Sequence, residues 1–301
     1  MDLIAIRTFC RAVEEGNLTA AAKSLHITKS VASRRIHLLE EELGVKLLSR
    51  STRGVSATDV GSLFYERGIT ILADVEDAKQ SVASTGQSLT GTIRLTAPRS
   101  FTDLNLKRPL LAFMELHPDL TLQLNLSDER VDIVSGGYDV GIRIADKLDD
   151  TSLIAKKLAK IHAHIVASPA YLEKHGTPQI PDDLKDHRCT LYSNLTASHQ
   201  WRFEKNGKHT SVRVKGTLTS NSGNLQLASV IHGLSITALP RFFVHEALAS
   251  GEVIDVLPDW ERPLSHLYAL YPERRLLPLK VRVFIDFLSA WYERKENTDC
   301  L

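Results

Sequence analysis

The chain has 301 residues, of which 43% are hydrophobic and 24% are charged, a composition typical of a soluble globular protein. No run of about 18 apolar residues is present, which argues against a membrane-spanning helix. Acidic side chains interrupt the N-terminus where a secretory signal would be apolar. We therefore expect two or three compact units located in the cytoplasm, with no membrane segment.

The net charge of +1 conceals an uneven distribution along the chain. Residues 1–58 contain nine Lys and Arg against six Asp and Glu, whereas residues 59–90 contain two against five. A small basic module at the N-terminus is thus joined to a neutral remainder, as expected for a domain that meets nucleic acid. The three cysteines lack the CxxC spacing of zinc or redox sites, which predicts free structural thiols at Cys10, Cys189 and Cys300.

Three short helices are predicted in the basic module. The first has apolar residues on one face at helical spacing, namely Leu3, Ile6, Phe9, Cys10 and Val13. Gly16-Asn17 ends that helix, and we expect Thr19 to cap a second helix over 20–25. Thr28 is expected to cap a third helix that stops at Gly44. Two short helices joined by a tight turn, the second basic on its outer face, are typical of a helix-turn-helix.

The third predicted helix has an inward apolar set, Val31, Ala32, Ile36 and Leu39, and an outward polar face. Lys and Arg on such a face can neutralise phosphates or donate to guanine, and Ser can reach either phosphate or base. The expected DNA-binding residues are Thr28, Lys29, Ser30, Ser33, Arg34 and His37, with Ser33 and Arg34 foremost. A hairpin over residues 46–56 would place Arg50 and Arg53 on flanking phosphates as a wing. The alternative is a polar face that only meets solvent.

A long amphipathic helix is predicted over about 58–89. Its apolar residues recur near every third or fourth position, at Val60, Leu63, Phe64, Ile69, Leu72, Val75, Ala78 and Val82. A helix of about 30 residues with a narrow apolar stripe and no neighbouring domain to cover it usually pairs with a copy of itself. The pattern therefore predicts a dimer.

Beyond Gly91 strand and helix patterns alternate, which predicts an α/β domain. The expected strands are 92–97, 120–126, 140–144, 161–167, 189–192, 212–218, 234–239 and 266–270. Helices are expected over 104–116 and 279–293.

With these residues in place, the chain resembles the LysR-type transcriptional regulators over its whole length. In the N-terminal part, the family's signature places are occupied by Phe9, Ala21-Ala22, Leu25, Ile27-Thr28, Val31-Ala32-Ser33, Ile36, Leu39-Glu40, Leu43-Gly44, Leu47-Leu48, Arg50, Arg53, Thr58 and Gly61. In the C-terminal part, the resemblance lies in Leu95-Thr96-Ala97-Pro98, Tyr138 to Arg143, Ala167 to Leu172, Leu234-Ser235-Ile236 and Leu239-Pro240. Many members have Gln-Pro where this chain has Lys29-Ser30, and Phe where it has Leu48. The first departure lies on the base-reading face and alters which operator is read.

The resemblance implies an N-terminal all-α winged helix-turn-helix with a long linker helix, then an α/β effector domain of two subdomains like those of periplasmic binding proteins. The implied domains are 1–58 for DNA binding, 59–90 for the dimerisation linker and 91–301 for effector binding. Subdomain I would hold 91–161 and 266–294, and subdomain II would hold 162–265. The implied partners are an interrupted inverted repeat in double-stranded DNA, a small-molecule effector, a homodimer or homotetramer, and RNA polymerase. No catalytic residue and no cofactor are implied.

Effector-binding residues are expected where strands pass into helices. The first such segment comprises Thr96, Ala97, Pro98, Arg99, Ser100 and Phe101, where backbone amides and the Ser100 hydroxyl could face an anion. Similar exits in subdomain II hold Tyr192, Ser193, Asn221 and Ser222. Arg99 suggests a small organic effector with a carboxylate, because a guanidinium binds carboxylates in bidentate fashion. An ordinary capped turn, with Arg99 facing solvent, is the alternative.

Other kinds of site have weaker support. His162 and His164 lie two apart on an expected strand, but no third ligand of suitable spacing is near, so no metal site is predicted. One rival interpretation is an α/β enzyme with a DNA-binding appendage, and the absence of GxSxG, GxGxxG and Walker motifs argues against it. A second rival is an architectural protein that bends DNA without an effector.

Overall fold

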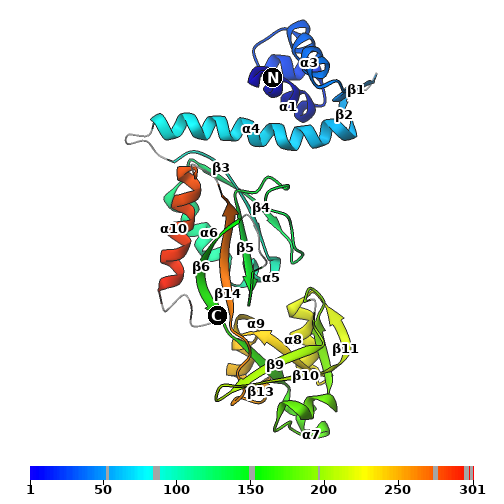
Figure 1. Cartoon of the computed structure of the whole chain (residues 1–301), viewed down its shortest axis with the longest axis vertical. Coiled ribbons are helices and arrows are strands. Elements are labelled where there is room, and N and C mark those ends of the chain that lie inside the picture. The colour runs from blue at the N-terminus through cyan, green and yellow to red at the C-terminus, as the bar shows by residue number, and fades with distance from the viewer. Residues whose placement is uncertain are drawn as a thin grey trace. The chain divides into compact units, whose positions relative to one another are not determined.

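The computed structural model describes residues 1–51, 54–83, 89–148, 153–195, 197–273, 277–294, 298 and 301 (Figure 1). These residues form two compact units. The first unit comprises Met1–Thr92 with Val134–Gly137, and the second comprises Ile93–Ile133 with Tyr138–Leu301. Among the described helices, none is long and apolar enough to span a membrane.

The first unit begins with three helices, α1 (Leu3–Glu15), α2 (Leu18–Ser24) and α3 (Lys29–Leu43). Gly16 ends α1 in the left-handed conformation, as predicted. The predicted cap of the second helix was wrong, because Asn17 and not Thr19 caps α2. The Asn17 side chain accepts hydrogen bonds from the amides of Thr19 at 2.8 Å and Ala20 at 3.3 Å. Asn is among the best N-cap residues, so α2 starts at Leu18.

Helix α3 has the predicted caps and nearly the predicted inner face. The Thr28 hydroxyl accepts a hydrogen bond from the Val31 amide at 3.4 Å, and Gly44 ends the helix with a φ of 69°. Ala32, Ile36 and Leu39 are buried in the core of the helical domain. Val31 is 39% exposed, so its assignment to the inner face was wrong. The buried positions follow i, i+4 and i+7, and Val31 lies off that stripe.

After α3 the chain forms a two-stranded wing and a long helix. Strand β1 (Leu48–Ser51) pairs antiparallel with β2 (Gly54–Ala57), and α4 spans Asp59–Ala83. Residues 84–88 of the predicted helix lie outside the described residues. Phe64 of α4 packs edge-on against Phe9, with ring centroids 5.5 Å apart. Part of the apolar stripe therefore covers the helical domain of its own chain, so the prediction that no neighbouring domain covers this helix was wrong.

The second unit contains two five-stranded sheets and a separate hairpin (Figure 1). The first sheet has the order β4-β3-β5-β14-β6, with bounds Leu120–Leu126, Gly91–Ala97, Val140–Ala145, Ser265–Pro272 and Leu153–Ile161. The second has the order β11-β8-β12-β7-β13, with bounds Lys215–Ser220, Arg188–Tyr192, Ile236–Pro240, Ala163–Ala167 and Ile254–Asp255. The hairpin pairs β9 (Gln200–Lys205) with β10 (Lys208–Arg213). The chain passes from the first sheet to the second after β6 and returns after β13.

Helices pack on both sheets. Helix α5 (Arg99–Phe101) continues through a π-helical turn (Thr102–Leu106) into α6 (Lys107–Leu116). The other helices are α7 (Pro169–His175), α8 (Gly223–Ile231), α9 (Arg241–Ser250) and α10 (Leu279–Glu293), and a 3₁₀ turn spans Pro181–Lys185. Beside the first sheet, the Phe113 ring of α6 lies 4.9 Å from that of Phe284 in α10. The last helix has the predicted bounds.

Two strand predictions needed correction. The range 212–218 was expected to be one strand, but β10 ends at Arg213 and β11 starts at Lys215. Within the range 161–167, β7 begins only at Ala163, because residue 162 is the link from the first sheet to the second.

Two of the cysteines are described, and both are free and buried. Burial raises the pKa of Cys10 to about 12 and that of Cys189 to about 12. Thiolate formation is therefore disfavoured at neutral pH, in agreement with the prediction of structural thiols. Cys300 lies outside the described residues.

Candidate DNA interface and effector region

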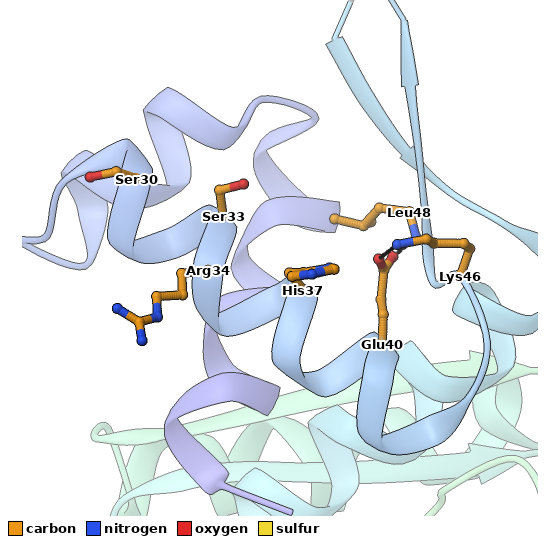
Figure 2. Close-up of a pocket in the computed structure, with 7 residues that line it drawn as sticks. All are labelled: Ser30, Ser33, Arg34, His37, Glu40, Lys46 and Leu48. Carbon is orange, nitrogen blue, oxygen red and sulfur yellow. Dashed lines mark hydrogen bonds and ion pairs between the residues drawn. The ribbon is translucent and has the colours of Figure 1, made fainter.

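The exposed face of α3 forms one wall of an open groove of about 590 Å³ (Figure 2). The groove is lined by Ser30, Ser33, Arg34, His37, Glu40, Lys46 and Leu48. Four of these were predicted DNA-binding residues, and they follow one another along α3. The other wall is the segment that leads from α3 into β1. The structure thus brings the helix face and the start of the wing to one surface.

The predicted DNA-binding residues differ in how far they are engaged within the chain. Among the described residues Arg34 has no hydrogen-bond or ion-pair partner, and its side chain is exposed. Lys29 is the exposed first residue of α3, at the positive end of the helix dipole. The Thr28 hydroxyl caps the helix and lies 2.9 Å from the Ser30 hydroxyl. His37 Nε2 lies 3.3 Å from Glu41 Oε1 one turn along the helix.

The predicted wing residues are only partly described. Arg50 lies on β1 opposite Val55, so its backbone belongs to the wing. Its side chain and the whole of Arg53 lie outside the described residues. The role of both residues on phosphates stays a prediction.

A buried carboxylate joins α3 to the wing. Glu40 is 7% exposed and accepts hydrogen bonds from Lys46 Nζ at 2.6 Å and from the amides of Leu47 at 3.0 Å and Leu48 at 3.1 Å. Burial raises the pKa of Glu40, but the bonds from Lys46 and the two amides outweigh it and hold the pKa below its ordinary value. Glu40 therefore stays ionised and fixes the start of β1 against α3.

Two close backbone approaches fix the rest of the wing. The Val55 amide donates to the Gly16 carbonyl at 2.9 Å, and a Cβ on Gly54 would lie 2.5 Å from that same oxygen. A Cβ on Gly61 of α4 would lie 1.9 Å from the Leu47 carbonyl oxygen. Only glycine permits these contacts. The wing is therefore tied to the end of α1, to α3 and to the start of α4.

In the second unit, the predicted effector residues after β3 lie at the start of α5. Thr96 and Ala97 are fully buried at the end of β3, and Pro98 precedes the helix. Arg99 is exposed and donates from Nη2 to the Leu126 carbonyl at 3.3 Å. The Ser100 amide and hydroxyl face the Asp128 carboxylate, at 3.4 Å and 3.3 Å. The Ser100 amide and hydroxyl, which were expected to bind an anionic ligand, thus already donate hydrogen bonds to a carboxylate of the chain itself.

The predicted residues of the second sheet lie at the ends of β8 and β11. Tyr192 ends β8, and its hydroxyl lies 3.5 Å from Asn194 Nδ2. Ser193 is exposed, and its amide donates to the Ser220 carbonyl at 3.1 Å. Asn221 is exposed, and the Ser222 hydroxyl caps α8 through the Leu225 amide at 3.3 Å.

Two contacts join the predicted effector segments of the two sheets. Asn194 Nδ2 donates to the Asp128 carbonyl at 2.6 Å. The rings of Phe101 in α5 and Phe242 in α9 meet edge to face, with centroids 5.3 Å apart. Residues from α5, from the end of β4 and from the end of β8 are thereby brought together. Within the described chain, the predicted residues Asn221 and Ser222 make no hydrogen bond to this group.

The histidines considered as a metal pair are separated by the fold. His162 lies between β6 and β7, whereas His164 is on β7 with Nδ1 2.6 Å from Asp255 Oδ2. The expectation that both share one strand was therefore wrong. In the described part of the chain, no group of three His, Cys, Asp or Glu side chains is placed to hold a metal ion.

Two family models match the chain. Residues 3–62 match the bacterial regulatory helix-turn-helix protein of the LysR family, and residues 86–293 match the LysR substrate binding domain. The chain belongs to the LysR-type transcriptional regulator family. The match assigns DNA binding to the helix-turn-helix of the first unit and effector binding to the α/β part of this LysR-type regulator. Members of this family are transcriptional regulators and not enzymes.

Individual relatives of this LysR-type regulator match it over nearly their whole length. An uncharacterised HTH-type transcriptional regulator of Haemophilus influenzae is 36% identical over 279 residues, which cover 93% of this chain and 96% of the relative. The virulence activator AphB of Vibrio cholerae, solved at full length, is 29% identical with a TM-score of 0.60, covering 97% of this chain and 100% of that one. CrgA of Neisseria meningitidis is 27% identical with a TM-score of 0.61, covering 98% and 100%.

Sequence reasoning missed three residues that shape the sites of this LysR-type regulator. Asn17 fixes the start of α2, Glu40 fixes the wing, and Asp128 meets Ser100 and Asn194. A signal for Glu40 existed, because an acid one position after the buried Leu39 falls next to the inner face of a helix. Asp128 had no such signal, since its partners lie 28 and 66 positions away in the chain.

Proposed function

We propose that this LysR-type regulator reads an interrupted inverted repeat in double-stranded DNA with the outer face of α3. Ser33 and Arg34 contact base edges, and Lys29 contacts a phosphate. The observation that supports this most directly is Arg34, an exposed guanidinium with no partner among the described residues, on a helix held rigidly by two caps and by Glu40. A guanidinium held in this way is ready to donate two bonds to guanine.

Two copies of the chain, or four, would present their α3 helices to the two halves of the repeat. Val60 and Leu63 of α4 support this, because they are 49% and 67% exposed while Phe64 is covered by the helical domain. Exposed apolar residues of this size on a long helix suit a second copy of that helix. The assembly acts in the cytoplasm and changes recruitment of RNA polymerase.

The proposed effector is a small organic carboxylate that binds near α5. Arg99 supplies the guanidinium, and its hydrogen bond from Nη2 to the Leu126 carbonyl leaves other donors of the guanidinium for a ligand. Tyr192 and Ser193 face the same region from the second sheet through Asn194. Since the Asp128 carboxylate already faces Ser100, the effector's carboxylate lies on Arg99 and not on the Ser100 amide.

The DNA-reading part is tested by fluorescence anisotropy with a selected operator fragment over a series of salt concentrations. Arg34→Ala should weaken binding by about 1–3 kcal/mol, roughly fivefold to 150-fold, and relax specificity at one position. Lys29→Ala should weaken binding to all sequences alike and reduce the slope of log K against log salt by about 0.9. Arg282→Ala, which removes the same charge from the exposed side of α10, is the control. Unchanged operator affinity in Arg34→Ala would refute the assignment.

The effector part is tested by thermal unfolding of the full-length protein with a panel of small carboxylic acids. All three tryptophans lie in the second unit, so their fluorescence reports the unit that should respond. A stabilising acid should lose its effect in Arg99→Ala and most of it in Arg99→Lys, which keeps the charge but not the planar fork. A neutral stabilising ligand that is indifferent to both variants would contradict the proposal.

A further inference from the structure

Strands β6 and β14 lie side by side at one edge of the first sheet (Figure 1). Their pairing brings basic residues together. His266 of β14 lies opposite Lys160 of β6, and Tyr268 lies opposite Lys157. Residues that lie directly opposite in an antiparallel pair project to the same face. The His266 and Tyr268 rings, whose centroids are 5.9 Å apart, confirm that these pairs share one face of the sheet.

A bulge in β6 produces this convergence. Lys157 and Lys160 are three residues apart, and in a regular strand they would project to opposite faces. The register shifts between Leu267 and Tyr268, so that Leu158 is the extra residue on β6. β-Bulges re-aim side chains in this way. Both ammonium groups consequently project on the side of His266.

Among the described residues, no acidic side chain forms an ion pair with the basic groups on this face. The side chains of Lys157 and Lys160 are exposed and have no ion-pair or hydrogen-bond partner among the described residues, and His266 Nδ1 is buried without a partner. Burial lowers the pKa of His266, and the charges of Lys157 and Lys160 lower it further. From β5, Ala145 lies on the other side of His266. Arg143, opposite Tyr268, donates to the carbonyls of Ile142 and Val131.

Protection of the sheet edge does not explain the arrangement. Lysines on an edge strand discourage pairing with another chain, and Lys156 and Lys157 together would serve that purpose on either face. Edge protection requires neither a bulge nor a histidine beside the lysines. The like charges of Lys157 and Lys160 on one face repel each other, and a bound anion would offset that cost.

We propose that Lys157, Lys160 and His266 form a binding site for a small oxyanion on the β6–β14 face of the first sheet. The two ammonium groups supply charge and the imidazole supplies a directional hydrogen bond. Because two lysines converge, the ligand chemistry is a multiply charged oxyanion, either a phosphate or a dicarboxylate. The site lies on β6 and β14, at the opposite edge of the sheet from β4 and Asp128, so it is separate from the proposed effector region.

The test is isothermal titration calorimetry of the full-length protein with inorganic phosphate and, separately, with malonate, at constant ionic strength. Lys157→Gln/Lys160→Gln should weaken binding of the preferred probe at least tenfold. The matched control is Lys156→Gln, which lies on the same strand but opposite Ala269, and so on the other face. Its affinity should stay within twofold of the unmodified protein. The preferred probe shows whether the site takes a phosphate or a carboxylate.

A second measurement follows the His266 imidazole by NMR, with its signal assigned from its loss in His266→Gln. Binding of the preferred probe should raise the pKa of His266, because the anion offsets the two lysine charges. Three results would overturn the proposal. The first is no binding of either probe, and the second is an equal loss of affinity in Lys156→Gln and in the double variant. The third is a His266 pKa that does not change when the probe binds. None of these bears on DNA binding by α3, so the proposed function is tested separately.

Discussion

Glu40 gives the most specific prediction about the DNA-binding domain, because one side chain holds α3 and the wing together. Glu40→Ala removes the acceptor for the amides of Leu47 and Leu48, which are 0% and 7% exposed as residues. A buried donor left without a partner costs about 1–3 kcal/mol, so two should cost about 2–6 kcal/mol. Lys46 contributes less, because its side chain is 68% exposed and a surface ion pair is worth about 0–1 kcal/mol.

The assay must separate the two units. The tryptophans Trp201, Trp260 and Trp291 all lie in the second unit. Amide hydrogen exchange of α1 to α3 therefore reports the first unit, and tryptophan fluorescence during urea unfolding serves as an internal control. We expect Glu40→Ala to lower the opening free energy of the first unit by about 2–6 kcal/mol. The urea midpoint of the tryptophan fluorescence transition should not change.

The effect of Glu40 should also depend on pH in one direction. Because the pKa of Glu40 is lowered in the folded chain, its carboxylate stabilises the fold above the ordinary pKa of 4.5, and this contribution is lost as the pH falls through the folded value. The difference between the unmodified protein and Glu40→Gln should thus shrink on acidification below about pH 5. A Glu40→Ala variant that loses no more stability than Lys46→Ala, or a stability difference between the unmodified protein and Glu40→Gln that grows in acid, would show that Glu40 does not hold the wing in this way.

Three further changes are informative. Gly61→Ala should destabilise the first unit by about 1–3 kcal/mol, seen by hydrogen exchange, because its Cβ would lie 1.9 Å from the Leu47 carbonyl oxygen; full stability would show that α4 can shift freely. Phe113→Ala should cost about 3–5 kcal/mol in the fluorescence transition, since the ring is fully buried; a loss below about 1 kcal/mol would contradict that packing. Cys10 and Cys189, each with a pKa raised to about 12, should react with a thiol reagent at pH 8 only when the protein unfolds. Rapid labelling of either thiol in the folded protein would contradict their burial.

Local signals in the sequence predicted the elements whose ends are set by neighbouring residues. The Thr28 cap, the Gly44 stop and the bounds of α10 are of this kind. The cap of α2 was misplaced because Asn17 was assigned to the end of α1, although Asn is a stronger N-cap residue than Thr19. Strand β6 was not predicted, since Leu153, Lys156, Lys157 and Lys160 do not alternate regularly.

The sites were less predictable than the elements for a physical reason. The exposed face of α3 depends on one helix, so its residues could be chosen from periodicity. The effector region depends on side chains from separate strands, and the contacts of Asp128 with Ser100 and Asn194 exist only in the folded chain. The same holds for the β6–β14 face, where a bulge reverses the face to which Lys160 would project.

Reading of a specific DNA sequence by α3 can be tested by a genome-wide selection of DNA fragments bound by the purified protein, repeated with Arg34→Ala. We expect enrichment of a short interrupted inverted repeat that is lost in the variant. Bound fragments with no shared motif, retained equally by Arg34→Ala, would contradict sequence-specific reading by α3 and favour architectural binding.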